Sequence, residues 1–474
     1  MQKLNEICSC ESKANSETEF VGIRCEKSKE DGALETSIIF PLGYFKDDST
    51  LRELPEEELR ECVVNLFTVL SDPSLQEQIH QDSSISTFAE EHGESEFPMV
   101  SYLNVIRNFL DFGYLDEKEI LYKKGANGKI NWGRTIKAVQ PVITEDAQNL
   151  VYLDFIARKV SYNEDTLITQ VHKFCVHDAL VKLGFLFGID PSEEPLLDFD
   201  YDLFCNAIHS KLAKTFNDRD LRLLADLARI VEYLAGHKTE DGKTADDFYF
   251  GVNTFAPVWE AMVDKIFGKL PQGVAKDKFN PHCEWDLSSG ARGYENPNYA
   301  MRPDTIMWDE EGNRLYVLDA KYYKFGMTGF VADLPSSGSI CKQIAYAEYV
   351  ETHWKTILGV DSIATPSASL QNDTQPKPIY NAFLLPYCFD ADNSQLPPDD
   401  GFETRPCKMR FIGFCHGNWK NLDARPGEED YRSYHRIAGI LLNVRSVMEN
   451  YGALGEAQKT LATCILRENS NCCT

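Results

Sequence analysis

Residues 302–326 have the sequence RPDTIMWDEEGNRLYVLDAKYYKFG, and this stretch decides the fold that we expect for the C-terminal half. The segments 305–308 (TIMW) and 314–323 (RLYVLDAKYY) are rich in the apolar, aromatic and β-branched residues typical of strands. The intervening DEEGN, at 309–313, consists of turn-forming residues, and we expect Gly312 to adopt a positive φ there. The stretch therefore predicts a β-hairpin.

Three charged side chains come together in this hairpin. Side chains two positions apart on a strand share a face, so Asp319 and Lys321 project together. Pairing of the strands brings Asp304, at the start of the first strand, alongside Asp319. Two carboxylates this close repel each other unless a cation neutralises them, and oxygen ligands suit Mg²⁺. Lys321 beside such an ion can orient an attacking water and stabilise developing negative charge, so the pattern predicts phosphodiester hydrolysis.

Each half of this pattern also has an ordinary explanation. Asp-Ala-Lys occurs on strands by chance, and Pro-Asp commonly opens a turn. The two halves together, with a suitable turn between them and a helix after them, favour the catalytic interpretation.

Pro303-Asp304, fourteen intervening residues and then Asp319-Ala320-Lys321 resemble the active-site signature of the PD-(D/E)XK nucleases. The phrase VLDAKYYK is similar to the form found in LlaJI-type restriction endonucleases and in McrC-like nuclease subunits. The resemblance is strong over about residues 250–450 and weaker over about 120–185. Further segments that share it are FAPVWEAMVDKIF (255–267), IYNAFLLPY (379–387) and GKINWGRTIK (128–137).

The resemblance implies an endonuclease that hydrolyses DNA with Mg²⁺, or with Mn²⁺ in its place, in a restriction or phage-defence system. It implies that Asp304 and Asp319 bind the metal and that Lys321 is the lysine of the motif. Such nucleases often add a glutamate from the helix ahead of the hairpin. Glu260 is the candidate here, and the alternative is a solvent-facing charge beside Trp259.

Some relatives also carry a glutamine and a tyrosine on the helix after the hairpin. Here Gln343 and Tyr346 are three positions apart instead of the usual four. Gln343 is therefore a candidate DNA contact, with a plain glutamine on the helix surface as an equal alternative. Lys324, just after the motif, is a further candidate, and a solvated lysine is its alternative.

The resemblance also implies partners. McrC-like nucleases work with an AAA+ GTPase, and LlaJI-type systems have several subunits. The segment GHKTEDGKT (236–244) does not have the P-loop spacing, so a motor would be another polypeptide. We expect double-stranded DNA as the substrate, and either a homodimer or another restriction subunit for two-strand cleavage. A nuclease subunit active mainly with a GTPase, and a nuclease of repair or transposition, are the alternatives.

The charge balance restricts how DNA could be bound. The chain has 74 acidic and 48 basic residues and a net charge of −26, which argues against non-specific coating of nucleic acid. DNA must therefore be met by a local basic surface or be delivered by a partner. The window 122–139 (YKKGANGKINWGRTIKAV) is the most basic short one in the chain. A solvated hairpin and a phosphate-facing loop explain it equally well. Its basic residues are Lys123, Lys124, Lys129, Arg134 and Lys137.

Length and patterning predict the domains. A chain of 474 residues exceeds one ordinary core, and we expect an α/β (α+β) class with three parts. Residues 1–95 form a small N-terminal α+β region for DNA or partner recognition, and residues 96–245 form a largely helical region with the basic loop. Residues 246–474 form the PD-(D/E)XK nuclease core, a mixed sheet flanked by helices. We expect helices at 54–73 and 434–451, among others, and strands at 378–387 and 408–419.

Two negative observations predict a cytoplasmic protein. The start of the chain has no apolar signal segment, and the longest apolar runs are far below the roughly 18 residues that cross a bilayer. The 14 cysteines are scattered, so we expect reduced thiols rather than disulfides.

Overall fold

The computed structural model divides the chain into two compact units. One unit holds Met1–Gln2 and Glu94–Phe248, and we call it the helical unit. The other, the sheet unit, holds Lys3–Gly93 together with Tyr249–Thr474, so the expected N-terminal region shares a unit with the C-terminal half. The residues that the structure describes are 8–12, 20–27, 34–75, 97–115, 117–125, 127–143, 150–163, 166–191, 193–236, 247–289, 292–294, 301–357, 378–389, 408–424, 428, 431–451 and 455–471.

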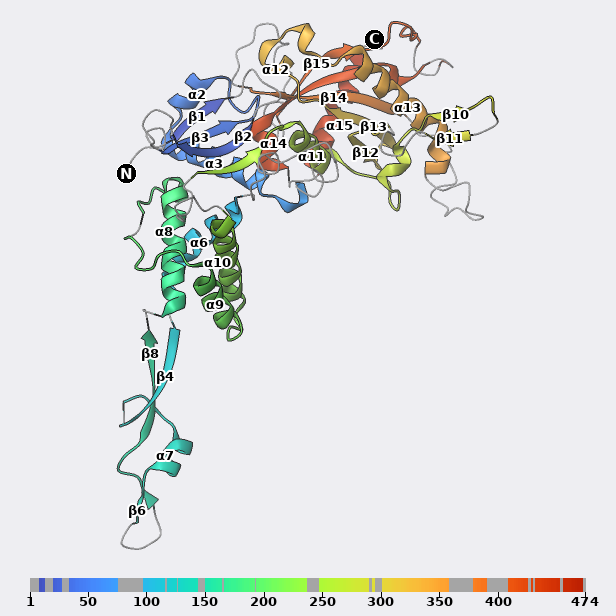
Figure 1. Cartoon of the computed structure of the whole chain (residues 1–474). Helices are drawn as coiled ribbons and strands as arrows, with labels where there is room; N and C mark the ends of the chain where they lie inside the picture. Colours follow the sequence, from blue (N-terminus) through green and yellow to red (C-terminus); the bar gives the residue numbers. More distant parts are fainter. Residues whose placement is uncertain are drawn as a thin grey trace, which may run out of the picture. The chain divides into compact units, whose positions relative to one another are not determined.

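A mixed five-stranded sheet forms the centre of the sheet unit, with the strand order β12-β13-β14-β16-β15 (Figure 1). Strands β13, β14 and β16 run parallel, and the edge strands β12 and β15 are antiparallel to their neighbours. This arrangement confirms the expected mixed α/β class. The strands are β12 (Thr305–Asp309), β13 (Arg314–Ala320), β14 (Ile379–Tyr387), β15 (Met409–Cys415) and β16 (Ile437–Asn443).

The predicted hairpin is β12 and β13, and its register places Thr305 opposite Leu318. The turn differs from the expectation in one respect. The residue with positive φ is Asn313, at 47°, and not Gly312. Gly312 leaves room for a neighbouring side chain, because a Cβ at this position would lie 2.3 Å from Oδ2 of Asp309 and that carboxylate would have to move. The glycine therefore permits a close approach rather than an unusual backbone conformation.

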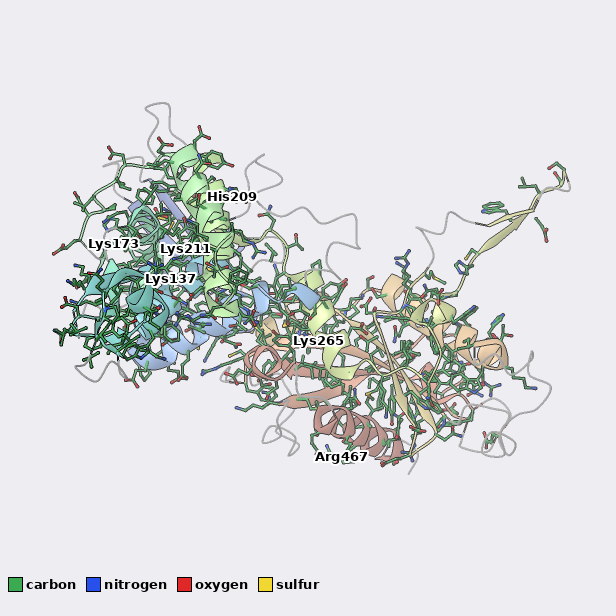
Figure 2. All side chains as sticks on the ribbon, turned by 90° about the horizontal axis from the view of Figure 1, so that it is seen from below. Lys137, Lys173, His209, Lys211, Lys265 and Arg467 are labelled. Atoms are coloured by element: carbon green, nitrogen blue, oxygen red, sulfur yellow. The ribbon has the colours of Figure 1, made fainter. Side chains whose placement is uncertain are left out.

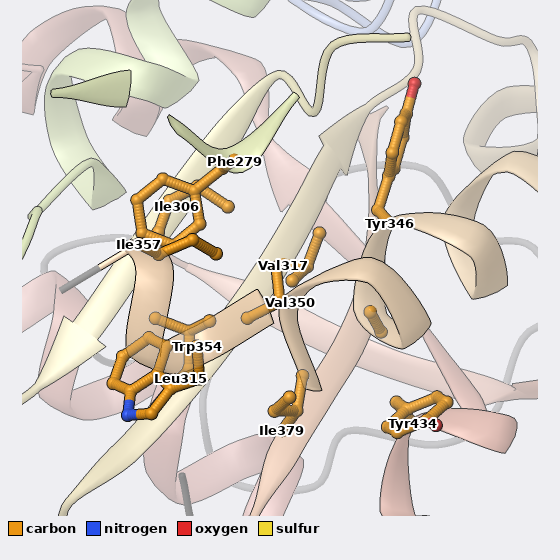
Figure 3. Close-up of a cluster of buried hydrophobic side chains, with 11 residues drawn as sticks. Phe279, Ile306, Leu315, Val317, Tyr346, Val350, Trp354, Ile357, Ile379 and Tyr434 are labelled. Atoms are coloured by element: carbon orange, nitrogen blue, oxygen red, sulfur yellow. The ribbon is translucent and has the colours of Figure 1, made fainter. Parts of the chain in front are cut away.

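Helix α13 (Ser337–Ile357) packs across β12, β13 and β14 through one apolar cluster (Figure 3). Burial of each large side chain there stabilises the fold by about 1.5–3 kcal/mol, so the helix and the hairpin are held as one body. The buried members of the cluster are Phe279, Ile306, Leu315, Val317, Tyr346, Ala347, Val350, Trp354, Ile357, Ile379 and Tyr434.

One predicted helix is wrong. Over 434–451 the structure has strand β16 followed by the shorter helix α14 (Val444–Asn450). Ile440, Leu441 and Leu442 are fully buried in this inner strand. A strand covered on both faces has a continuous apolar run without alternation, which periodicity does not distinguish from a buried helix.

Three N-terminal strands and the later strand β9 form a second sheet, with the strand order β1-β3-β2-β9. The predicted helix over 54–73 is confirmed as α3, and its buried face includes Leu59, Val63 and Leu66. Glu58 on this helix pairs with Arg445 of α14 at 2.7 Å. The elements are β1 (Cys8–Ser12), β2 (Val21–Lys27), β3 (Leu34–Phe40), α2 (Asp48–Glu53), α3 (Glu56–Leu70) and β9 (Phe248–Val252).

The remaining elements of the sheet unit surround the central sheet. Helix α11 contacts β12 and β13 and packs with α14 and α15. These elements are α11 (Ala256–Phe267), η1 (Lys276–Phe279), β10 (Glu284–Asp286), β11 (Arg292–Tyr294), α12 (Phe325–Thr328), η3 (Val331–Asp333), η5 (Ser433–His435) and α15 (Glu456–Asn471).

The helical unit contains the helices α6, α8, α9 and α10 (Figure 1), as expected for a largely helical region. A small sheet, β4-β8-β5, interrupts the helices. Within the described ranges no helix has the length and apolar content to span a bilayer. The elements are α6 (Met99–Phe112), β4 (Glu117–Lys124), β5 (Lys129–Ile130), α7 (Trp132–Ala138), β6 (Val142–Ile143), β7 (Leu150–Val151), β8 (Ile156–Asn163), α8 (Leu167–Phe187), α9 (Tyr201–Leu212) and α10 (Asp218–Gly236).

Candidate active site

The structure brings together the three charged side chains of the hairpin. Asp304 immediately precedes β12, Asp319 lies near the end of β13, and Lys321 follows that strand. The Nζ atom of Lys321 lies 2.8 Å from Oδ2 of Asp319 and 3.6 Å from Oδ2 of Asp304. The hairpin therefore presents two carboxylates and an ammonium at one point of the sheet.

Backbone hydrogen bonds fix this arrangement. The N–H of Ala320 donates to Oδ2 of Asp304 at 2.9 Å, which ties the first acid to the strand that carries the second. The N–H of Lys321 donates to the carbonyl of Leu384 on β14 at 2.9 Å. Because β14 is an inner strand, the end of β13 is held from the centre of the sheet.

The site is sheltered but open to solvent. The side chain of Asp319 is only 6% exposed, whereas those of Asp304 and Lys321 are 18% and 21% exposed. The exposed part of the site is therefore on the side of Asp304 and Lys321. The enclosed Asp319 sits in a medium that strengthens electrostatic interactions.

Burial and mutual repulsion dominate the electrostatics. Burial raises the pKa of Asp304 well above its ordinary value, and the negative charges of Asp319 and Glu260 raise it further, while Lys321 lowers it. Burial opposes the charge on Lys321, but Asp304 and Asp319 outweigh that effect and raise the pKa of this lysine. Asp304 and Asp319 thus repel each other, and in this structure the ammonium of Lys321 offsets part of that repulsion.

Glu260 comes to the site from α11. It is half-buried, and its charge acts on both Asp304 and Lys321. The neighbouring Trp259 is fully buried, and its indole N–H donates to the carbonyl of Leu384 at 3.4 Å. This anchor holds the helix against the sheet, and the charge of Glu260 acts on Asp304 and Lys321, so Glu260 is not a remote surface charge.

The donor set fits a divalent cation through its chemistry. Carboxylate oxygens are the ligands that Mg²⁺ and Mn²⁺ prefer, and the repulsion that raises the pKa of Asp304 is the kind that such an ion offsets. Across the described ranges, no three His, Cys, Asp or Glu side chains are already gathered as a ligand cage. Asp304 and Asp319 form the converged pair, and Glu260 is the nearby third acid.

Helix α13 places Tyr346 at the edge of the site. Burial raises the pKa of Tyr346 to about 12, and the charges of Asp319 and Asp304 add to the effect. Figure 3 shows its hydroxyl pointing away from the apolar cluster. A backbone hydrogen bond from Arg302 acts in the opposite direction on this pKa. Tyr346 therefore borders the site and contacts the segment that leads into Asp304.

Gln343 is placed differently from the expectation. Its side chain is fully buried, and Nε2 donates to the carbonyl of Val317 at 2.7 Å. Asn381 donates to the backbone carbonyl of Gln343 at 3.1 Å. Gln343 thus joins α13 to the sheet and has no access to a DNA strand, which corrects both readings of it as a surface residue.

The predicted basic residues of the window 122–139 are all exposed. The guanidinium of Arg134 lies 3.9 Å from the centre of the Tyr122 ring, and Lys124 pairs with Asp154 at 2.6 Å. Lys137 is another of these basic residues and belongs to the helical unit (Figure 2). The full set, Lys123, Lys124, Lys129, Arg134 and Lys137, lies on β4, β5 and α7.

Lys324, the remaining predicted contact, caps the start of α12 and belongs to the sheet unit. It is half-buried, and its carbonyl accepts hydrogen bonds from Met327 and Thr328 at 2.8 and 3.0 Å. The backbone of Lys324 is therefore structural, and its side chain remains a candidate contact.

Two comparisons with known proteins bear on this site. The family model of the LlaJI restriction endonuclease matches residues 40–395, which include the hairpin, α11 and α13. The chain is also similar to the "Type II restriction enzyme BsuMI component YdjA" of Bacillus subtilis (strain 168), at 25% identity over 248 residues. That match covers 50% of this chain and 51% of the relative, so the chain spans about half of the relative's length. On the family match, which extends over most of the sequence, the chain belongs to the LlaJI restriction endonuclease family.

Proposed function

We propose that this chain is a restriction endonuclease, or the nuclease subunit of one, that hydrolyses phosphodiester bonds in double-stranded DNA with a divalent cation. The observation that carries the proposal is the convergence of Asp304, Asp319 and Lys321 at one end of a hairpin, with Lys321 within 3.6 Å of both acids. Membership of the restriction endonuclease family supports the same reaction class. The motif and the mixed sheet agree with a PD-(D/E)XK nuclease.

The residues divide the work. Asp304 and Asp319 would hold the ion, with Glu260 as a third ligand from α11. Mg²⁺ or Mn²⁺ held there supplies Lewis-acid chemistry, namely a water of lowered pKa and compensation of charge on the phosphodiester. Lys321, whose raised pKa keeps it protonated, is placed to orient the attacking water and to stabilise the charge that develops on the phosphate.

A second candidate is a nuclease subunit that cuts only together with a partner. The matched Bacillus subtilis protein is named as a component of a type II restriction enzyme, and this chain spans about half of its length. The partner would be another restriction subunit, such as an AAA+ GTPase. In either case the reaction uses the same acids, and it would serve defence against incoming DNA.

The test is cleavage of a pooled random-sequence duplex library by the full chain in Mg²⁺ or Mn²⁺. We expect cuts at or near a short common sequence, and a loss of roughly 100-fold or more in Asp304→Asn, Asp319→Asn and Lys321→Met. Glu311→Gln is the matched control, because Glu311 is an exposed acid at the far end of the same hairpin. Undiminished cleavage by Lys321→Met would refute the assignment.

The second candidate predicts another outcome of the same assay. The chain alone would bind metal but leave the library intact, and cutting would begin when a co-purifying nucleotide hydrolase is added. Asp319→Asn would then remain inactive in the complex, whereas Glu311→Gln would cut like the unmodified chain.

A further inference from the structure

Asp304 is held through its backbone as well as through its side chain. Its carboxylate accepts the hydrogen bond from Ala320 described above. Its backbone carbonyl accepts a hydrogen bond from the ammonium of Lys276 at 2.5 Å. The same ammonium lies 2.9 Å from Oδ2 of Asp264. Lys276 therefore bridges the backbone of Asp304 to the side chain of Asp264.

This bridge links the backbone of Asp304 to the helix that carries Glu260. Asp264 lies on α11, four residues after Glu260. Residues four apart on a helix are neighbours on the same side, so the bridge leaves α11 from the side that carries Glu260. It reaches the backbone at the start of β12, where Asp304 lies. Lys276 thus adds a polar link between the helix of the third acid and the start of β12.

The backbone around Lys276 is itself anchored. Lys269 pairs with the outer edge of β12, where its N–H donates to Ile306 at 2.9 Å and its carbonyl accepts from Trp308 at 2.7 Å. Lys276 opens the short helix η1, which ends at the fully buried Phe279 (Figure 3). The lysine is therefore presented from a fixed segment.

We propose that Lys276 is a positioning residue that sets the spacing between Glu260 and Asp304, so that the acids are ready to take up a divalent cation. This inference rests on the proposed function. The side chain of Lys276 is 40% exposed, so its charge alone contributes little through solvent. Its effect comes from the two hydrogen bonds, and groups that orient metal ligands typically change metal affinity by about 10–100-fold.

The test is a calorimetric Mn²⁺ titration of the metal-free full-length protein without DNA. We expect Lys276→Met to weaken Mn²⁺ binding about 10-fold, and Lys276→Arg, which keeps a cationic donor, to restore most of the affinity. Asp264→Ala removes the other end of the bridge and should weaken binding similarly. The double variant should bind no more weakly than the worse single variant, because both changes break one bridge. At saturating Mn²⁺, cleavage by Lys276→Met should lie within about threefold of the unmodified chain.

Lys278→Met is the matched control, since Lys278 is an exposed lysine two positions further on. It should keep the unmodified Mn²⁺ affinity. Equal affinities of Lys276→Met and the unmodified chain, or an equal loss in Lys278→Met, would overturn the inference and leave the proposed function intact. Absence of Mn²⁺ binding by the unmodified chain would overturn both. If Lys276→Met fails to fold, the Mn²⁺ affinity of Asp264→Ala compared with that of Lys278→Met decides the question.

Discussion

The hydroxyl oxygen of Tyr322 accepts a hydrogen bond from the backbone N–H of Leu42 at 2.6 Å, across 280 positions of sequence. Tyr322 is the residue after Lys321, and both partners of the bond are buried. Its ring lies 5.5 Å from that of Phe255. The N-terminal segment therefore contacts the residue that follows Lys321. The end of strand β13 is thus held in part by a residue far outside the C-terminal half.

This contact predicts that Tyr322→Phe destabilises the sheet unit. The change leaves the buried N–H of Leu42 without its acceptor, which costs about 1–3 kcal/mol. Urea unfolding of the full chain should show this loss of unfolding free energy. Tyr323→Phe, at the adjacent half-buried position, is the control and should change stability little. Equal stability of Tyr322→Phe and the unmodified chain would show that the bond is dispensable.

Metal addition should stabilise the folded chain when both Asp304 and Asp319 are intact. Mg²⁺ or Mn²⁺ at 100 times its dissociation constant adds about 2.7 kcal/mol to the folded state, if the unfolded chain does not bind it. Thermal unfolding should therefore shift upward in the unmodified chain and in Glu311→Gln. Asp304→Asn and Asp319→Asn should show a much smaller shift, because each removes one acid of the converged pair. The same upward shift in all four proteins would place the ion elsewhere.

The helical unit should lose stability as the solution is acidified. Burial lowers the pKa of His172 from 6.5 to about 4, and its Nδ1 accepts a hydrogen bond from Leu115 at 3.0 Å. The folded state thus favours the neutral ring. The stabilisation is complete above about pH 6.5 and declines as pH falls toward 4, by about 3 kcal/mol in total.

His172→Gln isolates this effect. It retains an acceptor for Leu115 but does not titrate, so its unfolding free energy should fall less than that of the unmodified chain between pH 7 and pH 4.5. The measurement is urea unfolding followed through the signal of the helical unit. Parallel pH profiles of the two proteins would exclude His172 as the source.

The basic window can be tested through salt dependence. Each phosphate contact on duplex DNA contributes about 0.9 to the slope of the logarithm of affinity against the logarithm of salt concentration. Lys129→Gln combined with Lys137→Gln should reduce that slope by about 2 if both residues contact phosphates. The control combines Lys342→Gln and Lys355→Gln, two exposed lysines on α13. An unchanged slope in the first pair would favour the solvated hairpin.

The sequence predicted the hairpin because its turn and its two strands are local. The positions of Asp304, Asp319 and Lys321 follow from strand pairing alone, and the structure brings them together. The turn was less predictable, since both Gly312 and Asn313 tolerate unusual backbone conformations. The side chain of Asp309 lies close to Gly312, and the sequence does not show that closeness.

Other features could not be predicted because they depend on distant partners. Strand β16 had the composition of a buried helix, and only its pairing with β14 and β15 distinguishes the two. The contact of Lys276 with Asp304 joins a short helix to the start of a strand. The two residues are 28 positions apart, and no hydrophobic periodicity in the sequence indicates the contact. Gln343 is a polar residue that sequence alone assigns to the helix surface, but its side chain faces the sheet and is buried there.

The division into units has a consequence for how the sequence of this protein can evolve. The chain leaves the sheet unit after Gly93 and re-enters it at Tyr249, so one unit interrupts the other. Excision or replacement of the intervening module would leave Asp304, Asp319 and Lys321 and all strands of the central sheet in place. Exchange at these two points would therefore replace what lies between them, while the acids and the lysine of the hairpin are inherited unchanged.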